Sequence, residues 1–263
     1  MRLYYEIALR AFRRATTYRS AYVAGILTNA FFGALRSFMY IAIYGAGGAV
    51  AGFALSDAIS YTWVTQSLIS VGAGWVTSRE LMGSIRTGDV VTDMARPWNF
   101  YGYWLSQSLG ERGFNLLLRG SLTYLIGVLY FGARVPGPRE GLAFAAAIGL
   151  ALLLSFAFSF IVNMSAFWLL ESSGVMMMAN VMLSFFSGFL LPIAFFPPAL
   201  AAVARALPFQ AITGLPAQIF LGQIAGPDLA GALLLQVFWL AVLVGAGLLM
   251  LRAAEKKVVI QGG

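Results

Sequence analysis

Side chains that could carry out chemistry are few in this sequence, and their types exclude most enzymatic mechanisms. The 263 residues include no cysteine and no histidine. The usual general base, the commonest metal ligand and any thiolate nucleophile are therefore missing. The only lysines, Lys256 and Lys257, do not follow a glycine, which excludes the phosphate-binding loop of ATP-hydrolysing proteins. We expect no catalytic residue, no metal site and no cofactor in this chain.

Charged residues of both signs gather in one polar stretch, residues 77–99, between two apolar runs. Thr77 and Glu80 have the spacing of a capping box at the start of a helix. Gly88 suits the left-handed residue that ends such a helix, and Asp89 can cap a second one. We expect two short helices that form a compact projection; the alternative is an ordinary solvated loop.

The amino-acid composition indicates that the chain is a membrane protein. Hydrophobic residues make up 60% of the chain and charged residues only 10%, far from the quarter or so of charged residues in soluble domains. Several apolar runs reach the roughly 20 residues that a membrane-spanning helix needs. We expect an all-α polytopic membrane protein with one transmembrane domain, 1–263. The net charge of +7 fits membrane orientation and anionic lipids better than nucleic acid.

The order of apolar and polar segments predicts six spans. Residues 1–19 place basic side chains on one face and apolar ones on the other, as in a helix that lies in the headgroup layer. An aromatic segment at 98–104 marks a membrane interface before the third span. The expected spans cover about 21–44, 55–76, a third that reaches 131, 141–170, 175–195 and 229–251.

Residues 197–222 decide the topology. The segment is apolar but interrupted by prolines, so a straight spanning helix is not expected. If it crossed the membrane, the basic C-terminal cluster would lie opposite most of the 17 basic residues, against the positive-inside bias. We therefore expect both termini in the cytoplasm and an outer re-entrant or surface-lying hairpin between spans five and six. Its marker residues are Gly188, Pro192, Pro197, Pro198 and Pro208.

This layout resembles the permease subunit of type-2 ABC exporters, the ABC-2 family. The amphipathic N-terminal helix, the projection between spans two and three, and the run from Ser187 to Pro192 followed by Phe196-Pro197-Pro198 carry the resemblance. The segment IRTGDVVTDMARPWN is similar to a branch whose permeases are encoded in pairs. The resemblance implies an exporter in the cytoplasmic (inner) membrane of a prokaryote, with a second permease subunit, identical or homologous, and two ATP-binding cassette subunits that hold ATP and magnesium.

By the same resemblance, the projection would be the coupling helix that docks into an ATP-binding subunit. The residues expected at that contact are Glu80, Leu81, Ile85, Arg86, Gly88, Asp89, Val91, Asp93, Met94 and Arg96.

The residues of the cargo path are less clearly indicated by the sequence than those of the coupling contact. Arg36, near the outer end of span one, either contacts an anionic cargo, with Asp57 as a partner, or reaches the outer headgroups. Asn29, Gln66 and Asn180 are further path candidates, although amides in spans commonly bond between helices. The cargo stays open among drugs, lipids, peptides and polysaccharides. A membrane scaffold and a lipid-modifying enzyme are the competing functions.

Overall fold

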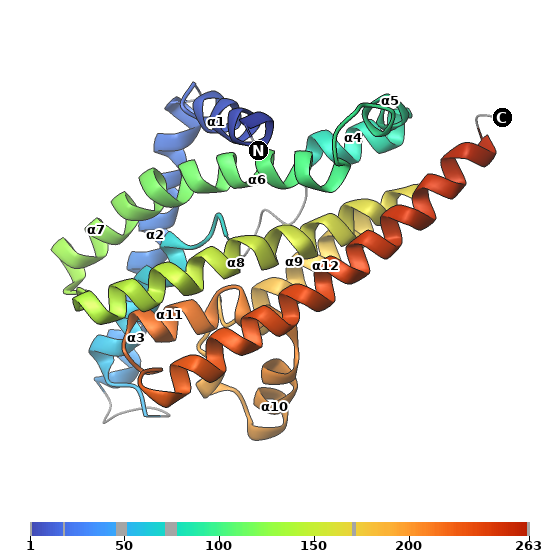
Figure 1. The fold of residues 1–263 in the computed structure, drawn as a ribbon. Helices are drawn as coiled ribbons and strands as arrows, with labels where there is room; N and C mark the ends of the chain where they lie inside the picture. Colours follow the sequence, from blue (N-terminus) through green and yellow to red (C-terminus); the bar gives the residue numbers. More distant parts are fainter. Residues whose placement is uncertain (1, 18, 46–51, 72–77, 170–171, 262–263) are drawn as a thin grey trace.

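Every regular element in the part of the chain that the computed structural model describes, residues 2–17, 19–45, 52–71, 78–169 and 172–261, is helical. Figure 1 shows α8 and α12 as two long helices that run side by side through the molecule. The helices are α1 (Arg2–Ala15), α2 (Arg19–Tyr44), α3 (Leu55–Ser67), α4 (Arg79–Thr87), α5 (Val90–Met94), α6 (Phe100–Phe114), α7 (Ser121–Phe131), α8 (Pro138–Met164), α9 (Ser173–Phe186), α10 (Pro198–Ala206), α11 (Gly214–Phe220) and α12 (Pro227–Gln261).

Among the described residues, four segments are long and apolar enough to cross a membrane: Ser20–Tyr44, Phe100–Phe131, Pro138–Phe167 and Pro227–Lys257. The second of these joins α6 to α7 through a π-helix, Asn115–Gly120. Four of the six expected spans therefore have spanning length. The expected spans two and five are shorter, because α3 has 13 residues and α9 has 14. At 1.5 Å per residue, each covers roughly 20 Å of a hydrocarbon core about 30 Å thick.

The short helix α3 is enclosed by other helices, and it packs against α2, α7 and α11. Its Trp63 is fully buried, and its ring lies against Gly33 of α2 and Gly127 of α7. A methyl group on Gly33 would come within 2.9 Å of that ring, so the helices approach this closely only because both positions are glycine. The indole N–H donates to the Ser37 hydroxyl at 3.0 Å, which satisfies the buried ring nitrogen.

The chain after α9 breaks where the glycine and proline pattern predicts. Gly188 has a φ of +80°, and its carbonyl accepts a hydrogen bond from the buried Tyr61 hydroxyl at 2.8 Å. Pro192 precedes a short 3-10 helix, Ile193–Phe195. These turns end α9 nine residues before the expected end of span five, because a left-handed residue followed by proline cannot continue an α-helix.

The segment 197–222 is broken, as predicted. Pro197 and Pro198 lie at the start of α10, and Pro208 starts a 3-10 helix that leads into α11. The described residues of α11 are mostly buried, whereas α10 alternates between buried and exposed residues. In Figure 1, α10 lies at the lower side of the molecule, while α1, α4, α5 and the C-terminal end of α12 lie along the upper side.

A polar lock fixes the end of this hairpin to the start of α8. Arg134 donates to the Leu221 carbonyl at 2.7 Å and pairs with the Glu140 carboxylate at 2.8 Å. The backbone N–H of Arg134 donates to the Ser60 hydroxyl at 2.8 Å. Through these contacts of Arg134, the loop after α7 is joined to α3, to α8 and to the end of the hairpin.

We predict that Gly222→Ala destabilises the hairpin more than Gly226→Ala. Both glycines have a positive φ, +71° and +59°, so both changes carry the same kind of backbone strain. Only at Gly222 would the new methyl group approach a neighbour, the Glu140 carboxylate, at 2.6 Å. Thermal unfolding in detergent should show a lower Tm for Gly222→Ala. Equal Tm values would mean that the lock does not hold the hairpin.

Candidate functional site

The projection predicted from residues 77–99 is formed by α4 and α5. The Ser78 hydroxyl accepts a hydrogen bond from the Leu81 N–H at 3.2 Å and caps α4. Gly88 ends α4 in the left-handed conformation, with a φ of +85°. The chain then turns directly into the five residues of α5. The two-helix prediction is confirmed for these residues.

Three details of the predicted capping are wrong or untested. Thr77 lies outside the described residues, and the side chain that caps α4 is Ser78. The predicted contact of Glu80 with Thr77 therefore lies outside the described residues as well; the Glu80 carboxylate binds side chains of α1 and α6. Asp89 makes no capping bond to α5; its carboxylate accepts instead from the Thr87 hydroxyl at 2.6 Å.

The projection has an inner and an outer face. Leu81, Ile85 and Val90 are between 1% and 9% exposed and pack with aromatic residues of α6 and α8 and with Leu251 of α12. Val91 is 48% exposed, although it is as apolar as its inward neighbours. Of the expected contact residues, Leu81 and Ile85 therefore hold the projection to the bundle. The exposed or half-exposed ones are Glu80, Arg86, Gly88, Asp89, Val91, Asp93, Met94 and Arg96.

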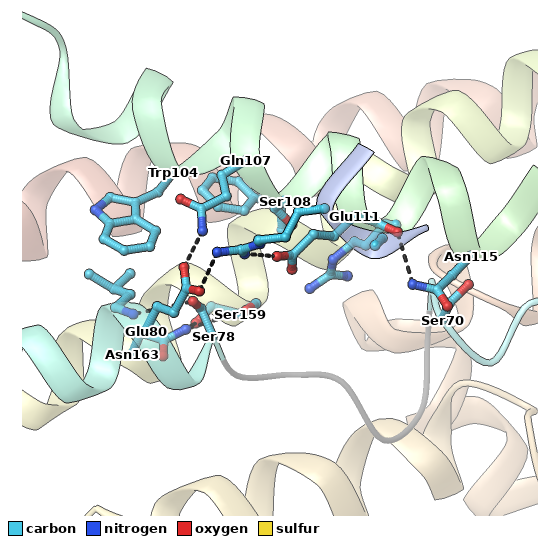
Figure 2. A pocket seen from close by; sticks show the side chains of 15 residues that line it. Ser70, Ser78, Glu80, Trp104, Gln107, Ser108, Glu111, Asn115, Ser159 and Asn163 are labelled. Carbon is cyan, nitrogen blue, oxygen red and sulfur yellow. Dashed lines mark hydrogen bonds and ion pairs between the residues drawn. The ribbon is translucent and has the colours of Figure 1, made fainter. Parts of the chain in front are cut away.

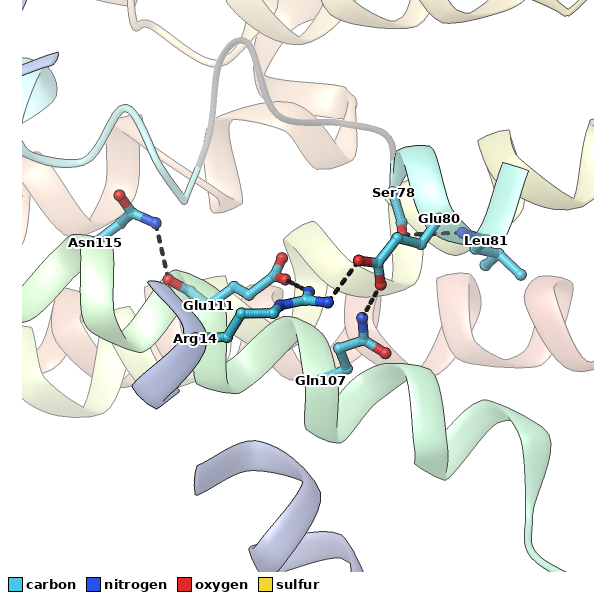
Figure 3. Close-up of polar contacts among 7 residues, drawn as sticks. All are labelled: Arg14, Ser78, Glu80, Leu81, Gln107, Glu111 and Asn115. Atoms are coloured by element: carbon cyan, nitrogen blue, oxygen red, sulfur yellow. Dashed lines mark hydrogen bonds and ion pairs between the residues drawn. The ribbon is translucent and has the colours of Figure 1, made fainter. Parts of the chain in front are cut away.

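A charged link joins the projection to the N-terminal helix (Figure 3). Arg14 of α1 donates to Glu80 of α4 at 2.6 Å and also pairs with Glu111 of α6. Gln107 of α6 donates to the second oxygen of the Glu80 carboxylate. The hydrogen bond that Arg14 donates to Glu80 is the largest cause that raises the pKa of Arg14 above its ordinary value. Three elements far apart in the sequence therefore meet at one guanidinium group.

The N-terminal helix is amphipathic, as predicted, but its apolar side packs on α6. The Tyr4 hydroxyl accepts a hydrogen bond from the Asn99 N–H at 3.1 Å, and the rings of Phe12 and Phe114 lie 5.4 Å apart. Gly110 lets the two helices touch, because a side chain there would collide with the backbone of Ala8. Movement of α6 or α4 would therefore be transmitted to α1.

A cavity of about 340 Å³ lies beside the charged link (Figure 2). Three polar atoms of residues that line it are buried and have no hydrogen-bond partner in the described part of the chain: the Ser70 hydroxyl, the Trp104 indole nitrogen and the Asn163 amide oxygen. Arg112, also in the lining, is buried and donates to the Val71 carbonyl and the Ser155 hydroxyl. Such a lining is typical of a hydrated space rather than of an empty one.

The structure brings some of the expected path residues together and separates others. Asn29 donates to the Gln66 carbonyl at 3.3 Å, and its amide oxygen accepts from Arg119 at 3.0 Å. Asn180 bonds to the Met176 carbonyl of its own helix at 2.9 Å. It lines a different, open groove on α9, of about 540 Å³.

The predicted contact between Arg36 and Asp57 is wrong. Its guanidinium donates to the Phe189 carbonyl at 3.0 Å and lies 5.0 Å from the centre of the Phe189 ring. Asp57 instead accepts from the backbone N–H of Ala54 at the start of α3. Arg36 therefore ties the outer part of α2 to the turn after α9.

The residues that join α1 to α4 could not be identified as a group from the sequence. Arg14 belongs to the basic face predicted for residues 1–19, and Glu111 and Gln107 lie in a long apolar segment. A weak signal was present, because Arg14 is in the last turn of an amphipathic helix whereas Glu111 is one of the few acids in an apolar run.

A family model described as "ABC-2 family transporter protein" matches residues 31–262. This range begins within α2 and includes α4, α5, the hairpin and all of α12. A search of curated proteins gives no match, and a search of solved structures gives none.

Proposed function

This chain belongs to the ABC-2 family of transporter proteins, and we propose that it is the permease subunit of an exporter driven by separate ATP-binding subunits. The observation that carries the proposal is the family match over most of the chain, together with a projection that is anchored inside the bundle and exposed outside. ATP and magnesium would bind to the partner subunits, because this chain has no lysine after a glycine.

The proposed topology has six passes with both termini in the cytoplasm of a prokaryotic cell. In support, α1, α4, α5 and the end of α12 lie on the same side, and α10 lies on the opposite side (Figure 1). In this topology, α3 and α9 are two short passes. The first is covered by α2, α7 and α11, which fits the rule that incomplete helices at membrane depth need protein around them.

The proposed contact with the ATP-binding subunit is the outer face of α4 and α5. Arg86, Asp89 and Val91 supply exposed charge and apolar surface there. Behind this face, Leu81 and Ile85 pack with residues of α6, α8 and α12. A displacement of the outer face would therefore be transmitted through packed side chains to α6, α8 and α12.

A second permease subunit would pair across the open groove of α9. Met177, Met178 and Val181 are 72%, 65% and 52% exposed on this short helix. Adaptable methionines beside Asn180 and Ser184 form an apolar surface with a few polar groups. We propose that this face lines the route of the cargo between the two permeases.

The function is tested by purification from native membranes through an affinity tag on the permease. The expected result is a complex that contains a P-loop protein and hydrolyses ATP. Recovery of the permease with no P-loop protein, under conditions where it stays folded, would contradict the proposal in favour of a scaffold or a membrane enzyme.

The topology gives a separate prediction. The chain has no native cysteine, so single cysteines report without background. In intact cells, a membrane-impermeant maleimide should label Ala202→Cys, within the hairpin, and Ala225→Cys, just after it, because both positions are exposed. Val91→Cys and Ala253→Cys should react only after the membrane is opened. If Ala202→Cys and Ala225→Cys were labelled from opposite sides of the membrane, the last span would have the opposite orientation to the one proposed.

A further inference from the structure

Arg119 lies at an unusual place in the third span. It belongs to the π-helix Asn115–Gly120, and its Nη2 donates to the Gly25 carbonyl at 3.2 Å and to the Asn29 amide oxygen at 3.0 Å. Gly25 makes room for this contact, because a methyl group there would lie 2.5 Å from the guanidinium carbon. π-Helical turns inside α-helices are frequent at functional sites.

No acidic side chain in the described part of the chain pairs with Arg119. Its two hydrogen-bond partners are uncharged oxygens of α2, and it forms no ion pair with any described residue. Its Nε–H is buried and has no partner among the described residues. A cation withdrawn from water without a counter-ion is costly in a membrane protein. The group therefore has both a charge and hydrogen-bond donors left for a ligand.

The surroundings of Arg119 indicate which anion can reach it. The neighbouring side chains Leu117, Leu118 and Leu122 are 64%, 41% and 41% exposed, as lipid-facing residues are in a spanning helix. Phe114, where the amphipathic α1 packs on α6, lies five residues earlier, or about 8 Å along the helix. The amphipathic sequence of α1 predicts a helix at the boundary between headgroups and acyl chains, and lipid phosphates are the anions found there.

We propose that Arg119 binds the phosphate group of a membrane lipid where the π-helix meets α2, in the leaflet that holds α1. Gly25 and Asn29 position the guanidinium through Nη2, and the N–H groups of Nη1, which have no partner among the described residues, donate to the phosphate oxygens, as the planar guanidinium allows. The proposal requires that α2 and α7 cross a membrane, and it does not require an ATP-binding partner. Its failure would therefore leave the proposed transport function untouched.

Lipid-dependent thermal stability of the detergent-solubilised protein tests this site. Dioleoyl phosphatidylglycerol should raise the Tm of the wild type by about 4 °C, since ligand binding stabilises the folded state. The diacylglycerol with the same chains lacks the phosphate and should raise it far less, and inorganic phosphate should not raise it. Arg119→Gln should abolish the shift, Arg119→Lys should keep part of it, and the matched control Arg13→Gln, on the exposed face of α1, should keep all of it.

Three results would overturn the proposal. An equal shift with diacylglycerol would assign the effect to acyl chains, and an equal shift with inorganic phosphate would assign it to a free-phosphate site. An undiminished shift in Arg119→Gln would place the lipid elsewhere. If Arg119→Gln does not fold, photolabelling of the wild-type protein tests the site. Phosphatidylglycerol with a photoactivatable headgroup should label peptides that contain residues 21–30 or 115–122. Labelling only of other peptides would contradict the assignment.

Discussion

Replacement of Val91 with aspartate is expected to release the ATP-binding subunits while the permease stays folded and inserted. Val91 is 48% exposed on α5, so the change costs little in the isolated permease. In the proposed complex, it would bury an unpaired carboxylate at the centre of the contact. Losses at such positions are about 2–4 kcal/mol, or roughly 30- to 700-fold in affinity. Co-purification of the ATP-binding subunit and transport should fall together.

The chain offers a closely matched control for this prediction. Val203 is 51% exposed on α10, another short helix, on the opposite side of the molecule. Val203→Asp should therefore leave ATP-binding subunits bound. If Val91→Asp retained full binding and full transport, the outer face of α5 could not be the contact. If both variants lost binding, the effect would be on the fold and not on a docking surface.

Arg14→Glu is expected to uncouple ATP hydrolysis from transport without releasing the ATP-binding subunits. The change places three carboxylates together, at positions 14, 80 and 111, where the guanidinium now holds α4 and α6 to α1. Half-exposed ion pairs contribute only about 0–1 kcal/mol to stability, so the Tm should change little. The loss should appear in the coupling, as roughly a tenfold fall in transport per ATP hydrolysed, equivalent to about 1.4 kcal/mol.

Two variants separate this link from a general charge effect. Arg13→Glu makes the same charge change at the adjacent exposed position, where no ion pair is present in the described structure, and should leave transport unchanged. The double change Arg14→Glu with Glu80→Arg restores opposite charges and should recover much of the loss. Equal defects in Arg13→Glu and Arg14→Glu, or no recovery in the double variant, would remove the link from the coupling mechanism.

Features that depend on local signals could be predicted from the sequence. The amphipathic pattern of α1, the break at Gly88 between α4 and α5, and the interruptions at Pro198 and Pro208 each act within a few residues. Left-handed glycines and prolines restrict the backbone wherever the chain is packed. The family resemblance, confirmed by the match to residues 31–262, followed from the order of these same signals.

Features that depend on distant contacts could not be predicted. Ile85 has the pattern of a contact residue, but its burial depends on aromatic residues from α6 and α8 that complete the cluster. Glu80 has the spacing of a capping box, but no local signal indicates that Arg14, 66 positions earlier, binds its carboxylate. The lengths of α3 and α9 were overestimated because hydropathy does not distinguish one long helix from a shorter helix that is followed by apolar turns.

Site-specific photo-crosslinking can show whether the outer face of α4 and α5 receives the ATP-binding subunit. A photoreactive amino acid would be placed at Val91 or, as the control, at Val203, in the full complex in native membranes. We predict a crosslinked product at Val91 that contains a P-loop protein, and none at Val203. A folded, transporting complex in which the P-loop protein crosslinks equally at both positions, or at Val203 alone, would contradict the account.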